Sequence, residues 1–175
     1  LSPSSAGQMC IRDSLPYYIT SPVIMLLLES GIPVEAITVM VQKEAAQRLC
    51  AKVGTRQAGA VTAAVQFYGK AELLFEVSRG SFMPSPNVDS AVIRIKPDKY
   101  YRSMVDDKDL FFKVVRGAFS QRRKTMVNSL SSVLGVPKSL LSECLEFCGI
   151  EKNIRAEQLS MEELILFANR LKNVI

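Results

Sequence analysis

Histidine and tryptophan are both missing from this 175-residue sequence. Without histidine, the chain has no Ser-His-Asp or Cys-His system for nucleophilic catalysis and no metal site that needs an imidazole ligand. The four cysteines include no Cys-x-x-Cys pair, so neither a zinc site nor a disulfide framework is expected. Reduced thiols, as in the cytoplasm, fit this pattern best.

Long hydrophobic runs are also missing. One of the longest, residues 22–28, ends at Glu29 and is far shorter than a membrane span. Residues 1–14 have neither a basic start nor an apolar core, so they do not read as a secretory signal. With 48% hydrophobic and 22% charged residues, the composition predicts a globular chain, and its length predicts one domain, or one domain with a small extension.

Acidic residues are absent between Asp109 and Glu143. The same interval holds six cations, a charge of +6, whereas the whole chain carries +5. Such a concentration of positive charge is typical of a surface that binds a polyanion such as nucleic acid. On charge alone, the alternative is an ordinary solvated helix face. The six cations are Lys113, Arg116, Arg122, Arg123, Lys124 and Lys138.

The first half of the sequence alternates helical and strand patterns, which is typical of an α/β sheet. Residues 1–13 are polar and irregular, and we expect them to lie outside the core. The predicted strands are residues 36–41, apolar on both faces, and residues 73–77 and 91–95, which form an antiparallel pair. The predicted helices are residues 21–30, 43–51 and 58–68, the last of them closed by Gly69.

After Pro97 the patterns become helical. Apolar stripes at helical spacing include Leu110, Leu140 and Met161, and Ser160 with Glu163 forms a capping box for the last helix. We therefore expect three parts. They are a segment over residues 1–13 outside the fold, an α/β domain over residues 14–97, and a small all-helical domain over residues 103–175.

Residues 14–18 stand where a strand would run into a helix. Ligands of open α/β sheets bind beyond the carboxyl ends of strands, which makes this segment a candidate site. Pro16 fixes the local chain, and Tyr17 offers a flat face on which a planar base can stack. The alternative is a rigid turn whose tyrosines pack in the core.

Two further segments carry candidate functional residues. In residues 82–90, two prolines stiffen a loop that presents Phe82, which would form the other side of a stacking slot. The alternative is a hairpin-like loop with a buried phenylalanine. In residues 119–125, the run Arg122-Arg123-Lys124 suits phosphate, because arginine donates forked hydrogen bonds and lysine acts as a point charge. The alternative here is a capping or bridging role within the helical domain.

Together these segments resemble the ribosomal RNA adenine dimethyltransferase family, the small-subunit dimethyladenosine transferases. The resemblance covers about residues 14–171, and five motifs occur in the family's order. Each motif is weak alone, but five in order are specific. The motifs are Leu15-Pro16-Tyr17 of the family's Asn-Leu-Pro-Tyr, Gln42-Lys43-Glu44 followed by Arg48, the loop over residues 82–91, the basic run over residues 119–125, and residues 155–160.

The resemblance implies a partial Rossmann-like class I methyltransferase sheet followed by a helical RNA-binding domain. It also implies transfer of methyl groups from S-adenosylmethionine to N6 of two neighbouring adenines in small-subunit ribosomal RNA during ribosome biogenesis. The implied partner is the precursor of the small ribosomal subunit, and the full-length enzyme would be a cytoplasmic monomer without metal or membrane. The implied RNA contacts are Arg122, Arg123 and Lys124, together with Lys113 and Arg116.

The resemblance assigns catalytic roles to Leu15, Pro16, Tyr17 and Phe82. The carbonyl of Pro16 and the side chain at position 14 would accept hydrogen bonds from the N6 amino group and draw its lone pair out of conjugation. Tyr17 and Phe82 would sandwich the flipped base. Orientation and electrostatics of this kind need no histidine.

Two departures from the family pattern change what this chain is expected to do. Ser14 stands where the family has the asparagine of its cofactor-binding position, and a serine hydroxyl is shorter than a carboxamide. No Gly-x-Gly-x-Gly follows a strand. We therefore expect a C-terminal portion that lacks the cofactor-binding half, begins with 14 residues foreign to the family, and is inactive alone. The alternatives are a non-catalytic RNA-binding module, or a relative that acts on large-subunit RNA or in transcription.

Overall fold

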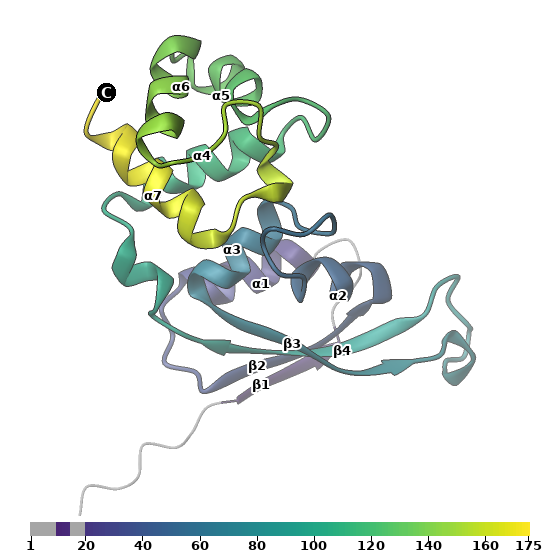
Figure 1. The fold of residues 1–175 in the computed structure, drawn as a ribbon. Helices are drawn as coiled ribbons and strands as arrows, with labels where there is room; N and C mark the ends of the chain where they lie inside the picture. The colour runs from purple at the N-terminus through teal and green to yellow at the C-terminus, as the bar shows by residue number, and fades with distance from the viewer. Residues whose placement is uncertain (1–9, 15–19) are drawn as a thin grey trace, which may run out of the picture. The chain divides into compact units, whose positions relative to one another are not determined.

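The computed structural model describes residues 10–14 and 20–175, and these form two compact units (Figure 1). The first comprises the described residues up to Cys50 together with residues 68–98, and the second comprises residues 51–67 and 99–175. The chain thus passes between the units three times rather than once. Residues 51–67, expected in the α/β part, group with the helices instead.

The first unit is built on a four-stranded sheet in the order β1-β2-β4-β3. β1 and β2 run parallel, whereas β4 is antiparallel to both of its neighbours, β2 and β3. This arrangement confirms the α/β class and the antiparallel pair at the end of the sheet. The strands are β1 (Cys10–Ser14), β2 (Ala36–Gln42), β3 (Gly69–Val77) and β4 (Ser90–Pro97).

Strand β1 corrects the expectation for residues 10–13, which belong to the sheet, whereas residues 1–9 lie outside the described residues. Residues 10–14 pair in parallel with residues 36–40 of β2, in register from Cys10 opposite Ala36 to Ser14 opposite Met40. Their sequence shows no apolar alternation. A short strand at a sheet edge is held by backbone hydrogen bonds to its neighbour, and these do not depend on side-chain pattern.

Two helices, α1 (Thr20–Glu29) and α2 (Lys43–Leu49), cover one face of this sheet (Figure 1). β2 alternates rather than being buried on both faces: Ile37, Val39 and Val41 are fully buried, but Thr38 and Met40 are only half-buried. The expectation of a strand buried on both faces is therefore wrong, because the described helices of this unit cover only one side.

β3 begins earlier than predicted because of Gly69. We expected this residue to close a helix, but it is the first residue of β3 and lies opposite Pro97. A Cβ at this position would collide with the carbonyl oxygen of Lys96. Only glycine lets the two backbones approach this closely.

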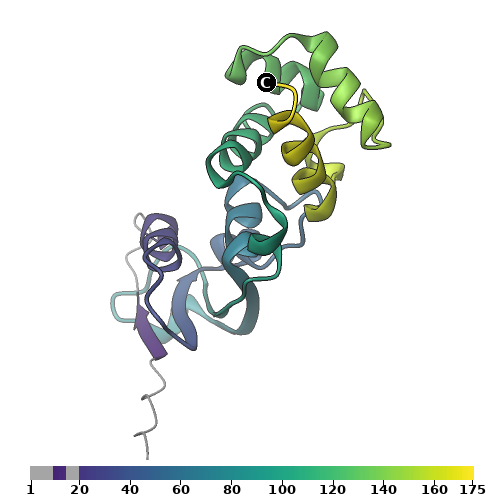
Figure 2. The ribbon, with the colours of Figure 1, turned by 90° about the vertical axis from the view of Figure 1, so that its left-hand side faces the viewer.

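The second unit is helical, and Figure 2 shows α4 to α7 (green to yellow) packed together. α3 joins their core through Phe67, whose ring stacks on Phe111 at 5.3 Å and meets Phe112 edge-on at 4.9 Å. This packing explains why residues 51–67 group with the helices. The helices are α3 (Ala60–Tyr68, except its last residue), α4 (Lys108–Phe119), α5 (Met126–Leu134), α6 (Lys138–Phe147) and α7 (Met161–Lys172).

The start of α7 confirms the predicted capping box. The Glu163 N–H donates to Ser160 Oγ at 3.2 Å, and the Ser160 N–H donates to Glu163 Oε2 at 2.7 Å. α5 was not predicted, although its boundary signals are ordinary. Thr125 caps its first turn, and Gly135 ends it at a φ of 67°.

Candidate functional site

The sheet brings three separate segments of the chain to one edge. Because β1 and β2 are parallel, both end at this edge. Gln42, the last residue of β2, lies opposite Ser90, which in turn lies opposite Val77. The edge therefore collects the end of β1 at Ser14, the start of α2 and the two ends of the loop over residues 78–89, and ligands of α/β sheets bind at such an edge.

One predicted part of the site lies outside the described residues. This part comprises Leu15, Pro16 and Tyr17, so neither their backbone nor their side chains are described. The structure describes the backbone of Ser14, which ends β1 opposite Met40. It thus places the start of the Pro-Tyr segment at the same edge as the loop that carries Phe82.

Hydrogen bonds rather than prolines alone order the loop over residues 78–89. The Arg79 N–H donates to Asp89 Oδ1 at 2.9 Å, and Ser85 Oγ donates to the Arg79 carbonyl at 2.9 Å. The Lys43 N–H donates to the Asp89 carbonyl at 3.0 Å, which ties the loop to the start of α2. The two ends of the loop are thereby held together beside α2.

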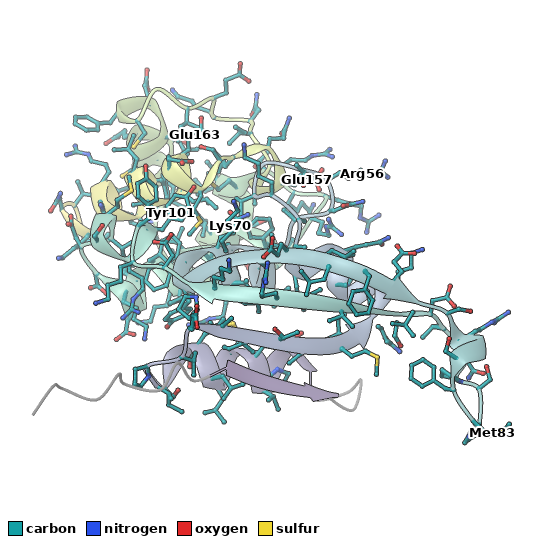
Figure 3. All side chains as sticks on the ribbon, turned by 90° about the horizontal axis from the view of Figure 1, so that it is seen from below. Arg56, Lys70, Met83, Tyr101, Glu157 and Glu163 are labelled. Atoms are coloured by element: carbon teal, nitrogen blue, oxygen red, sulfur yellow. The ribbon has the colours of Figure 1, made fainter. Side chains whose placement is uncertain are left out.

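Phe82 follows the short 3₁₀ turn Arg79–Ser81 in extended conformation. Its side chain is half-buried, so both the stacking role and the alternative of a hairpin-like loop with a buried phenylalanine stay predictions. Met83, the next residue, is 99% exposed and lies at the outer end of the loop in Figure 3. The loop thus offers one half-exposed aromatic ring and, at its tip, an exposed apolar side chain.

A pocket of about 460 Å³ lies between the start of α2 and this loop. The residues that line the pocket include two cations and two carboxylates, so their formal charges cancel. A hydrogen bond and the charge of Glu76, whose Oε2 lies 2.7 Å from Lys43 Nζ, raise the pKa of Lys43. The pocket is lined by Gln42, Lys43, Glu44, Gln47, Arg79, Asn87, Val88 and Asp89.

The predicted RNA-contacting cations fall into two groups. Lys113 and Arg116 are exposed on α4, and Arg123 and Lys124 are exposed in the turn between α4 and α5. The side chains of these four form no hydrogen bond or ion pair with the residues that the structure describes. They are accessible for phosphate contacts.

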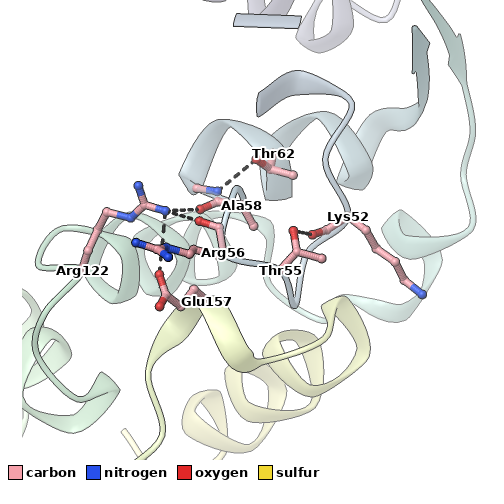
Figure 4. A network of polar contacts seen from close by, with 8 residues as sticks. Lys52, Thr55, Arg56, Ala58, Thr62, Arg122 and Glu157 are labelled. Atoms are coloured by element: carbon pink, nitrogen blue, oxygen red, sulfur yellow. Dashed lines mark hydrogen bonds and ion pairs between the residues drawn. The ribbon is translucent and has the colours of Figure 1, made fainter. Parts of the chain in front are cut away.

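Arg122 behaves differently. Its Nη2 donates to the carbonyl oxygens of Arg56 at 2.5 Å and Ala58 at 3.3 Å, and it lies 3.8 Å from Glu157 Oε2 (Figure 4). The structure therefore favours the bridging role left open for this residue. It also reveals Arg56, an exposed cation that motif reasoning missed. One sequence signal was available: residues 51–67 hold two cations and no acidic residue.

Two kinds of feature are absent from residues 10–14 and 20–175. In this part of the chain, no three His, Cys, Asp or Glu side chains gather into a group able to hold a metal ion. None of its helices is both long and apolar enough to cross a membrane.

Curated relatives match the chain over most of its length. The ribosomal RNA small subunit methyltransferase A of Geobacillus thermodenitrificans is 45% identical over 161 residues, and that of Alkaliphilus oremlandii is 44% identical over 159 residues. Each match covers 90% of this chain and 55% of the relative. The chain thus spans little more than half the length of these proteins.

Solved structures give the same fold. A dimethyladenosine transferase from Plasmodium falciparum is 25% identical with a TM-score of 0.78, covering 90% of this chain and 64% of that one. The 23S rRNA methyltransferase ErmE is 20% identical with a TM-score of 0.66, and the match covers 98% of this chain and 68% of that one. This second match supports the fold alone. These neighbours agree with the predicted methyltransferase-type α/β architecture.

The family match corrects one expectation and settles the wider assignment. The sequence model described as ribosomal RNA adenine dimethylase matches residues 5–173. The expectation that residues 1–14 are foreign to the family is therefore wrong from residue 5 onward. Since the match spans nearly the whole sequence, this chain belongs to the ribosomal RNA adenine dimethylase family.

Proposed function

We propose that the full-length protein methylates N6 of two neighbouring adenines in small-subunit ribosomal RNA, using S-adenosylmethionine, and that this chain supplies the substrate-binding side. One observation carries the proposal. The end of β1 at Ser14, the start of α2 and the two ends of the loop with Phe82 lie at a single sheet edge, which supports the proposal. These are the segments whose motifs match the family.

At this edge the chain's own groups hold and orient the target base. Tyr17 and Phe82 stack on the two faces of an adenine flipped out of the RNA. The carbonyl oxygen of Pro16 and the side chain of Ser14 accept hydrogen bonds from the two N6 hydrogens. Such acceptors pull the N6 lone pair out of conjugation and aim it at the methyl donor, so the rate gain comes from orientation and electrostatics.

The residues present do not fit a site for S-adenosylmethionine. Within the described part of the chain, β2 runs into α2 at Gln42–Lys43 without an intervening loop or glycine. The sequence after β1 is also free of glycine as far as Ser30. A phosphate- or nucleoside-binding turn of the Rossmann type needs glycines at such a junction. We therefore expect the 175-residue chain alone to transfer no methyl group.

A non-catalytic RNA-binding module remains the second candidate. The four exposed cations on α4 and in the turn after it favour it, because they suit phosphate contacts whether or not methyl transfer occurs. The two candidates differ in one measurable property, the appearance of methylated adenine.

The test is methyl transfer by the full-length product of the gene that encodes this chain. Purified small and large ribosomal subunits are each incubated with labelled S-adenosylmethionine, and N6,N6-dimethyladenosine is quantified after nuclease digestion. We expect the product in small subunits alone. Binding without transfer to either particle would favour the non-catalytic module, and transfer to large subunits alone would identify the other kind of relative.

In the same assay, Phe82→Ala should lower kcat/KM by about five- to 160-fold, because stacking on an aromatic ring contributes about 1–3 kcal/mol per base. Phe75→Ala is the matched control, since Phe75 is a phenylalanine of β3 that is 55% exposed. An unchanged kcat/KM in Phe82→Ala, or an equal loss in both variants, would remove Phe82 from the site.

A further inference from the structure

Two basic segments that lie 66 residues apart in the sequence meet within the helical unit. The Arg122 guanidinium donates to the carbonyl oxygens of Arg56 and Ala58, as Figure 4 shows. We refer to residues 51–59, between α2 and α3, as the basic loop. Arg122 therefore connects this loop to the turn that presents Arg123 and Lys124.

Several further contacts fix the basic loop to the same unit. Val53 and Ala58 are buried, at 3% and 1% exposure, and anchor the loop at two points. At its start, Gln66 Nε2 donates to the Ala51 carbonyl at 3.0 Å. Gly54 adopts a φ of +94°, and a Cβ there would lie 3.4 Å from the Leu159 carbonyl oxygen. The loop is thus an ordered element with a defined shape.

The exposed residues of the basic loop are strongly cationic. Lys52 and Arg56 are both exposed, and among the described residues no hydrogen bond or ion pair engages either side chain. Residues 51–67 contain no acidic residue. At the junction, the Glu157 carboxylate lies 3.8 Å from Arg122. The junction therefore joins two cationic surfaces.

The Nη2 group of Arg122 is not free to bind a phosphate. This group is already shared between two carbonyl oxygens, and the neighbouring Glu157 carboxylate repels an incoming anion. Arg56 has no such competitor in the described part of the chain, and a free guanidinium offers the forked donors that phosphate accepts. The two arginines at the junction thus differ in what they can do.

We propose that the basic loop is a second phosphate-contacting element for RNA, with Arg56 beside Arg123 and Lys124, and that Arg122 is a positioning residue for this loop. The proposal rests on the proposed function only for the choice of RNA as the partner. Phosphate contacts of this kind add affinity without reading sequence. They also make binding depend on salt, because each neutralised phosphate releases counterions.

The test measures binding of the 175-residue chain to small-subunit ribosomal RNA over a range of salt concentrations. Arg56→Ala should weaken binding and reduce the slope of log K against log[salt] by about 0.7–0.9, the value for one lost phosphate contact. The substitution keeps the backbone carbonyl of residue 56, which accepts the hydrogen bond from Arg122. Lys152→Ala is the matched control, since it removes an exposed cation of the same unit that lies outside both basic segments and pairs with Glu146, and it should leave the slope unchanged.

A double-mutant cycle tests the role of Arg122. If Arg122 acts through the loop, Arg122→Ala reduces the slope in the wild-type chain but has no further effect once Arg56 is alanine. Arg123→Ala should reduce the slope by the same amount whether residue 56 is arginine or alanine. Arg122→Lys, which keeps a donor, should restore part of the slope. Additive effects of Arg122→Ala and Arg56→Ala would show that Arg122 contacts RNA directly and would overturn its positioning role.

The outcomes separate this inference from the function on which it rests. A wild-type chain that shows no salt-dependent binding to the RNA would contradict both. A wild-type chain that binds, with Arg56→Ala indistinguishable from it, would contradict the basic loop alone. Thermal unfolding of each variant shows whether the fold survives, and Arg56→Ala is expected to melt like the wild type because its side chain is exposed.

Discussion

At the scale of single residues, three neighbours in the sequence have different roles. Arg122, Arg123 and Lys124 form one basic run, and charge alone predicts one shared function for them. The structure separates Arg122, whose partners are Arg56 and Ala58, from the other two. A partner 66 residues away leaves no local pattern, so this distinction was not predictable from the run itself.

A second feature at this scale is the thiol of Cys50. Burial, with a smaller effect from the charge of Glu72, raises the pKa of Cys50 to about 11 from an ordinary value of 9.0. At pH 8 this thiol is therefore almost fully protonated, and the thiolate is the reactive form. We expect the rate at which iodoacetamide alkylates Cys50, measured by peptide mass spectrometry, to rise with pH up to about pH 11.

The same pKa shift makes the folded state less stable at high pH. The unfolded thiol ionises near pH 9 while the folded one stays protonated, so the stability from this group is complete below pH 9 and falls between pH 9 and 11. Glu72→Gln should lower the alkylation midpoint slightly. An alkylation rate that levels off by pH 9 in the folded protein would contradict the raised pKa.

At the scale of elements, periodicity predicted those whose partners are local. The capping box of Ser160 and Glu163 marked the start of α7 correctly. β1 was missed because its pairing with β2 is made by backbone atoms. α5 was missed although Met126, Val127 and Leu130 form a buried stripe between Thr125 and Gly135, so the signal was present in the sequence.

The pairing of β3 with β4 depends on Gly69. In Gly69→Ala, the new Cβ would meet the Lys96 carbonyl group and Pro97 Cα, which are backbone atoms and cannot swing aside. We expect the free energy of unfolding, measured in urea, to fall by about 1–3 kcal/mol, as for other overpacked positions.

Gly59→Ala is the matched control for this prediction. A Cβ at Gly59 has no atom within 4 Å, and this residue has no positive φ. It should change stability by less than about 1 kcal/mol, because alanine restricts the unfolded chain but is less favourable than glycine at the residue that precedes α3. Equal effects of the two substitutions would show that the close approach of β3 and β4 does not limit stability.

At the scale of the whole molecule, the sequence predicted the fold class and the family but not the division of the chain. The two acid-free basic segments belong to one unit only because α3 packs on the helices through Phe67. Packing of this kind depends on tertiary contacts that periodicity does not encode.

The candidate site was predicted as far as its sheet edge, which follows from strand order, and the roles of Tyr17 and Phe82 there stay predictions.

The central claim is that a flipped adenine binds at this edge, between the segment after Ser14 and the loop over residues 78–89. Small-subunit ribosomal RNA with 8-azidoadenosine at a target position tests it most directly, by photo-crosslinking to the full-length protein and mass spectrometry of the crosslinked peptides. We expect crosslinks at Tyr17 and Phe82, with the Phe82 crosslink lost in Phe82→Ala. Efficient crosslinking confined to the helical unit, with neither segment labelled, would contradict the claim.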